Sequence, residues 1–92
     1  MLRFTLRIPE SGSLKDKRQV VRSVMPRIRN KFQVAVAEVD DNEAWQIATI
    51  GVACVSNSAR HADEILAEIV AYVEGSRLDA EVTDVETEVI AL

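Results

Sequence analysis

Apolar and polar residues alternate along the first eight residues of the chain. The apolar positions are Leu2, Phe4, Leu6 and Ile8, and the polar positions between them are Arg3, Thr5 and Arg7. A period of two is typical of a β-strand with one buried face. Pro9 predicts the end of this strand, because proline has no backbone donor for a sheet.

Helical spacing replaces the alternation after residue 13. Ser13 and Asp16 resemble a capping box, and apolar residues then recur at intervals of three, four and seven. This pattern predicts a helix over residues 14–30. Pro26 lies inside it and removes one backbone donor, so we expect a kink or a tightened last turn there.

Two further β-rich runs and a second helix follow. Residues 33–39 and 45–55 flank the polar turn Asp40-Asp41-Asn42 and predict a hairpin. Residues 56–58 supply polar capping side chains for a helix that carries apolar residues over 62–73 and stops at Gly75. Residues 82–90 predict a last strand.

The order β-α-β-β-α-β predicts one α+β domain over residues 1–92 with a ferredoxin-like arrangement: a four-stranded antiparallel sheet with both helices on one face. We also expect the first and third strands to be neighbours and to run parallel. The loops that enter the two helices would then share one edge of the sheet. Ser13, Asn57, Arg60 and His61 are the candidate anion-binding residues at that edge, although caps and surface positions explain them equally well.

Composition excludes several classes of protein. The chain has 92 residues, enough for one core, and no apolar run of the length that a bilayer requires. A single cysteine excludes an internal disulfide, and the first residues lack the pattern of a secretory signal. We therefore expect a cytoplasmic protein that is not embedded in a membrane.

Charge is distributed unevenly along the chain. Residues 1–31 carry a net +7, whereas residues 32–92 carry a net −11. At about 100° per residue, Lys15, Arg18, Arg22 and Arg29 fall within roughly 60° of one another on the first helix. Such a ridge could follow a phosphate backbone, although an exposed charged face is also the default for an amphipathic helix.

Lys17 is placed differently from the ridge, near the apolar centre of the same helix. A lysine there must extend its head group to solvent or find an acidic partner. One alternative is an ion pair with a carboxylate of the later, acidic strands. The other is that Lys17 joins the anion-binding residues.

The sheet face opposite the helices offers a second surface. Arg3 and Arg7 should lie on it, and Asp84, Glu86 and Glu88 share one parity on the last strand, so we expect cross-strand ion pairs. Apolar residues of the third strand favour an alternative role for this face, as a homodimer interface or as part of a module that binds a small anion or other ligand.

Catalytic signatures are missing from the sequence. It has no G-x-S-x-G, no phosphate-binding loop and no paired Glu-x-x-His helices. The acidic turn formed by Glu38, Asp40, Asp41 and Glu43 lacks calcium-loop spacing. We therefore expect a protein that is not an enzyme and that holds no cofactor or metal.

Three segments together resemble a known family. They are Ser13-Leu14-Lys15-Asp16-Lys17-Arg18, Val34 to Val39, and Trp45-Gln46 leading to Val55-Ser56-Asn57. The chain resembles the YlxP-like family, formerly a domain of unknown function. The resemblance implies a ferredoxin-like fold and a bacterial protein whose genes often lie among translation genes, and some members are labelled ribosome-binding factors. The family's S-L-K-x-K-R signature corresponds here to Ser13, Leu14, Lys15, Lys17 and Arg18, and the Trp45-Gln46 pair also matches. The resemblance implies no catalytic residue.

These observations favour a non-enzymatic accessory factor that associates with ribosomal RNA or a ribosomal subunit. The residues expected to bind RNA are Lys15, Lys17, Arg18, Arg22 and Arg29.

Overall fold

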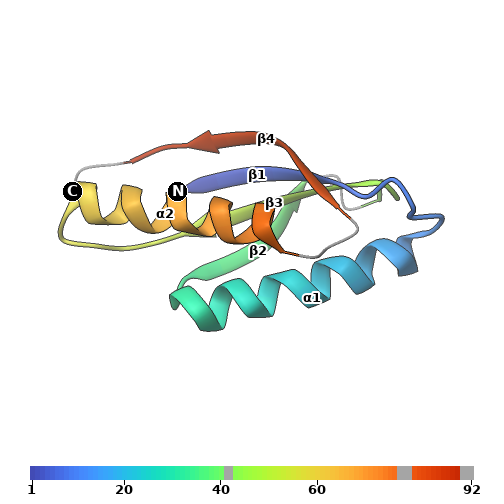
Figure 1. Ribbon diagram of the computed structural model, residues 1–92, viewed down its shortest axis with the longest axis horizontal. Coiled ribbons are helices and arrows are strands. Elements are labelled where there is room, and N and C mark those ends of the chain that lie inside the picture. The colour runs from blue at the N-terminus through green and yellow to red at the C-terminus, as the bar shows by residue number, and fades with distance from the viewer. Residues whose placement is uncertain (41–42, 77–79, 90–92) are drawn as a thin grey trace.

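A computed structural model describes residues 1–40, 43–76 and 80–89 of the chain (Figure 1). The predicted order of elements is confirmed, and so is the ferredoxin-like α+β arrangement. The elements are β1 (Leu2–Arg7), α1 (Leu14–Phe32), β2 (Ala35–Asp40), β3 (Ile47–Ala53), α2 (Ala59–Gly75) and β4 (Glu81–Thr87). Ile90, the last residue of the predicted final strand, lies outside the described residues.

The strands form one sheet in the order β2-β3-β1-β4, and every neighbouring pair is antiparallel. The prediction that the first and third strands are neighbours is confirmed, but the prediction that they run parallel is wrong. Each β-α-β crossover returns the chain in its starting direction, whereas the hairpin between β2 and β3 reverses it. Consequently β3 runs opposite to β1, and the first turns of α1 and α2 lie at opposite ends of the molecule (Figure 1).

The core lies between one face of the sheet and the two helices. The alternation in β1 buries Leu2, Phe4 and Leu6, and β3 buries Ala48, Ile50 and Val52 against the same side. The helices close this layer with apolar residues spaced three or four apart, which are Val21, Val24 and Ile28 from α1 and Leu66, Ile69 and Val73 from α2. The opposite sheet face carries no helix (Figure 1).

Local chemistry sets the ends of α1. The Ser13 side chain accepts a hydrogen bond from the Asp16 amide at 3.1 Å, and the Asp16 carboxylate accepts one from the Gly12 amide at 3.1 Å. Gln33 ends the helix in the left-handed conformation (φ 54°), with its amide bonded to the Arg29 carbonyl. Pro26 lies inside the helix and does not end it, because α1 continues to Phe32, two residues past the predicted end.

Two register shifts change which side chains meet on the open sheet face. The pairing shifts between Thr5 and Leu6 along β1–β4 and between Glu38 and Asp40 along β2–β3. Arg7 therefore pairs with Glu81 at 3.0 Å, and Arg3 reaches Asp40 at 3.0 Å. The expected class of ion pair is present, but the partners predicted from parity, Asp84, Glu86 and Glu88, are wrong.

Candidate nucleic-acid interface

The basic ridge is the row Lys15, Arg18 and Arg22 on the solvent side of α1. All three side chains are exposed, because the ridge flanks the side of the helix on which α1 buries its residues. Lys15 and Arg22 are separated by seven residues, or about 10 Å along the helix axis. That length matches the rise of about three phosphates along one strand of a duplex, at 3.4 Å per phosphate.

Most other cations of the described residues are held by partners of their own; the exception is Arg27, which is exposed on another side of α1 and forms no ion pair with a described residue. Arg3, Arg7 and Arg60 form ion pairs with Asp40, Glu81 and Glu64, and Lys31 lies over the rings of Phe32 and Tyr72. By contrast, Lys15, Arg18 and Arg22 form no ion pair or hydrogen bond with any residue that the structure describes. The three ridge side chains thus keep their charge available to an external anion.

Lys17 does not belong to this exposed surface. Its side chain is 1% exposed, and its Nζ lies 3.0 Å from Glu38 Oε2 and 3.3 Å from the Ile47 carbonyl oxygen. The ion-pair alternative is therefore the correct one, and the assignment of Lys17 to the RNA-binding set is wrong. Burial excludes its ammonium group from a solvent-borne ligand.

Arg29 continues the row of the basic ridge beyond Arg22 and fixes the position of that row relative to the sheet. Its guanidinium donates a hydrogen bond to the Val36 carbonyl at 3.3 Å, on the edge strand β2. The side chain is exposed but already has an acceptor, so it is less available than the other three. The contact shows that the ridge runs along the β2 side of α1.

Gln46 ties the start of β3 to the loop that enters α1. Its Nε2 donates to the carbonyl oxygens of Pro9 at 3.4 Å and Ser11 at 3.3 Å. Ser11 is buried and its hydroxyl donates to the Ser13 carbonyl at 3.0 Å. Sequence reasoning predicted the class of the Lys17 partner, a carboxylate of a later strand, but not its identity as Glu38, because the two residues lie on segments that meet only in the folded chain.

The candidate anion edge does not exist as one surface. Ser13 caps α1 at one end of the sheet, whereas Asn57, Arg60 and His61 lie at the start of α2 at the other end (Figure 1). The antiparallel course of β1 and β3 causes this separation. Local partners explain two of these residues, since Ser13 caps the Asp16 amide and Arg60 pairs with Glu64 at 3.3 Å.

The open sheet face divides into an apolar half and a charged half. The β2–β3 half exposes Val39 and Ile47, and continuing the β3 alternation adds Trp45, which is 55% exposed. Val39 lies over Gly51, so closely that a Cβ at Gly51 would be 2.8 Å from Val39 Cγ1. The β1–β4 half carries the arginines and the acidic residues of β4.

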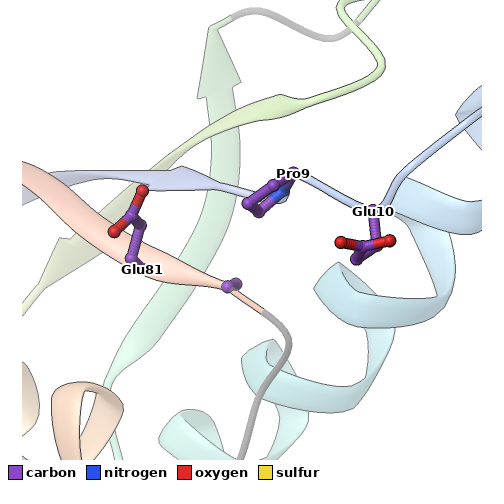
Figure 2. Close-up of a pocket in the computed structure, with 4 residues that line it drawn as sticks. Pro9, Glu10 and Glu81 are labelled. Atoms are coloured by element: carbon purple, nitrogen blue, oxygen red, sulfur yellow. The ribbon is translucent and has the colours of Figure 1, made fainter.

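Two hollows lie away from the ridge. The smaller, about 230 Å³, is lined by Pro9, Glu10, Ala80 and Glu81; Pro9 lies between the two carboxylates (Figure 2). Its negative charge disfavours an anion. The larger, about 730 Å³, is an apolar groove beside the start of α2, lined among others by Cys54, Val55, Leu66 and Val89.

Metal and membrane chemistry receive no support from the described ranges. No three His, Cys, Asp or Glu residues are clustered there in a way that could hold a metal ion, and Asp41 of the acidic turn lies outside those ranges. Of that turn, Glu38 and Asp40 already pair with Lys17 and Arg3. Neither described helix has the length and apolar character needed to cross a membrane.

Comparison with known proteins shows which family this chain belongs to. A family model described as "Protein of unknown function (DUF503)" matches residues 1–87. The chain belongs to the DUF503 family. It is also similar to a protein of Bacillus subtilis (strain 168) named "Uncharacterized protein YlxP", with 35% identity over 67 residues that cover 73% of each protein.

In this DUF503 chain, the residues that carried the resemblance separate into two groups. Lys17 is buried and Gln46 is exposed, but the contacts of both hold α1, its entry loop and the start of β3 together. Lys15 and Arg18, from the same signature, face solvent without a partner among the described residues. The contacts that Lys17 and Gln46 make within the fold account for their part in the resemblance. Lys15 and Arg18 make no such contacts among the described residues, so the fold does not account for theirs.

Proposed function

We propose that this DUF503 protein is a non-enzymatic accessory factor that associates with ribosomal RNA through the basic ridge of α1. The observation that carries the proposal is that three cations without partners among the described residues, Lys15, Arg18 and Arg22, stand in one row on α1, whereas Arg27, which also lacks such a partner, lies off that row. The ridge cations lack partners among the described residues, whereas Lys17, Arg3, Arg7 and Arg60 are paired internally. Unpaired cations spaced along a rigid helix suit a phosphate backbone.

The overall charge supports a directed approach to such a partner. The chain has a net charge of −4, yet the ridge lies on α1, while the exposed acids of β4 lie on the opposite edge strand of the sheet. A polyanion is attracted to one side of this molecule and repelled from the other. The charge separation therefore favours one orientation of the protein on RNA.

Charge reversal at two ridge positions tests the proposal. Arg18→Glu/Arg22→Glu should abolish co-sedimentation with ribosomal subunits in a sucrose gradient at moderate salt. The matched control is Arg27→Glu/Arg60→Glu, which makes the same change in net charge at exposed positions off the ridge. Circular dichroism spectra should be unchanged in both variants, because none of these side chains is buried.

Salt dependence gives a second measurement. Each phosphate contact contributes about 0.7 to 0.9 to the slope of log K against log salt concentration. Three contacts from the ridge predict a slope of about −2 to −3, and the double variant should lose most of it. Co-sedimentation of the double variant at wild-type level would refute the assignment of the ridge.

The apolar half of the open sheet face favours a second candidate function, self-association. Val39, Trp45 and Ile47 expose large apolar side chains on the β2–β3 half of the sheet. Two copies that pack these patches together would remove them from water, as paired sheets do. Sedimentation velocity over a wide range of protein concentration tests this candidate, and a monomer at the highest concentration would exclude it.

A further inference from the structure

Trp45 is the exposed aromatic residue of this chain. The sequence contains four aromatic residues, and the other three are covered: Phe4 is buried, and Phe32 and Tyr72 pack edge to face with ring centroids 5.7 Å apart. Trp45 is 55% exposed. A large flat ring in contact with water is available to stack on a planar ligand.

The contacts of its neighbours place Trp45 at the same end of the molecule as the ridge. The Gln46 side chain donates hydrogen bonds to the loop that enters α1. Lys17, on the first turns of α1, places its Nζ 3.3 Å from the Ile47 carbonyl oxygen. The start of β3 is thus held against the first turns of the helix. Lys15 and Arg18 lie on those same turns.

The ridge and Trp45 lie on either side of the edge strand β2. Arg29 places the ridge on the β2 side of α1, and β2 is the last strand of the sheet on that side. A strand that follows the ridge and rounds this edge toward the open sheet face can reach the indole of Trp45.

Two carboxylates near this edge are balanced within the fold. Glu38 is paired with Lys17, and Asp40 is paired with Arg3. Glu43, two residues before Trp45, is exposed and forms no ion pair with a described residue, so the attraction for a phosphate near this edge comes from Lys15 and Arg18.

We propose that Trp45 stacks on an unpaired base of an RNA whose phosphates lie on the ridge. This inference rests on the proposed function and specifies the class of RNA: a loop or single strand, whose bases can turn out, and not an uninterrupted duplex. A-form duplexes hide their base faces, whereas single-stranded segments are recognised by stacking on aromatic side chains.

The experiment compares two RNA probes that share one strand. The first is a single-stranded RNA of about twelve nucleotides, and the second is the same strand annealed to its complement. Fluorescence anisotropy of labelled RNA gives the affinities. Emission from Trp45, the sole tryptophan in the chain, reports directly on contact with a base.

Saturating single-stranded RNA should quench the emission of Trp45. Trp45→Ala should weaken single-strand binding about tenfold and leave duplex binding unchanged, whereas Trp45→Phe should retain most of the affinity, since stacking is worth about 1 to 3 kcal/mol per base. Arg18→Glu/Arg22→Glu should weaken binding of both probes. Circular dichroism establishes that each variant is folded.

Three results would overturn the inference. Wild-type affinity in Trp45→Ala, with emission unchanged on binding, would remove Trp45 from the site while the ridge proposal stands. Failure of the wild-type protein to bind either probe would remove both proposals together. An emission shift that depends on protein concentration without RNA, and is accompanied by a dimer in sedimentation, would assign Trp45 to a contact between two copies.

Discussion

Replacing Lys17 by methionine isolates the role of the buried ion pair. Methionine keeps most of the unbranched side chain but removes the ammonium group, which contacts Glu38 Oε2 at 3.0 Å and the Ile47 carbonyl at 3.3 Å. The variant leaves the Glu38 carboxylate facing α1 without its cation. We expect Lys17→Met to destabilise the domain strongly even though methionine suits a core.

The magnitude follows from the burial of the two partners. Removing one member of a buried pair costs about 3 to 5 kcal/mol. The Glu38 side chain is 19% exposed, so water relieves part of this penalty, and we expect a loss of about 2 to 3 kcal/mol in the free energy of unfolding. For a domain of this length, that corresponds to a fall in Tm of roughly 10 to 20 °C. Urea denaturation and thermal melts followed by circular dichroism measure both quantities.

A double variant separates the ion pair from general packing. Lys17→Met/Glu38→Val replaces the pair by apolar side chains, which is often neutral in buried sites, so most of the lost stability should return. Lys15→Met, on the exposed ridge, should change stability by less than about 0.5 kcal/mol. The reasoning is refuted if Lys17→Met melts like the wild type, or if adding Glu38→Val lowers stability further.

Two other substitutions test local features of the fold. Gly51→Ala should lose about 1 kcal/mol, because the new methyl group would meet Val39 Cγ1 at 2.8 Å; in a Val39→Ala background the same change should cost nothing, and equal losses in both backgrounds would contradict the proposed contact. Ser13→Ala should cost about 1 kcal/mol through loss of the cap on the Asp16 amide, whereas Ser13→Asp should retain stability; a melt of Ser13→Ala that matches the wild type would show that the cap contributes nothing.

Helix α1 shows which features of a helix can be predicted from the spacing of apolar residues in the sequence. The spacing of its apolar residues predicted both the helix and the side that it buries, and Ser13 predicted its start. The predicted end, residue 30, was two residues short of the observed end at Phe32. Pro26 is exposed, and the helix continues beyond it because the apolar face of the last turns, Ile28 and Phe32, packs on the core.

The candidate site was predicted less completely than the fold. The angular position of Lys15, Arg18 and Arg22 placed them together on an exposed face, as the structure has them. The joint anion edge failed because strand direction depends on the whole path of the chain and not on any local pattern. The partner of Arg7 was missed because the register shift within β1–β4 places Glu81 opposite it. Arg3 does lie opposite Glu86, as parity predicts, but its ion pair is with Asp40 of β2.

Local periodicity by itself determined the six elements of this protein, their order, and the buried side of the first strand and of both helices, but not that of the third strand, whose two faces are both apolar. It also determined that α1 carries a row of cations, because the angle between residues on a helix is fixed by backbone geometry. Tertiary structure alone decided which cations are free. Lys17 and Lys15 are two residues apart, yet one is buried against Glu38 and Ile47 while the other faces water. That difference depends on which strands pack against α1, and the packing exists only when distant segments of the chain meet.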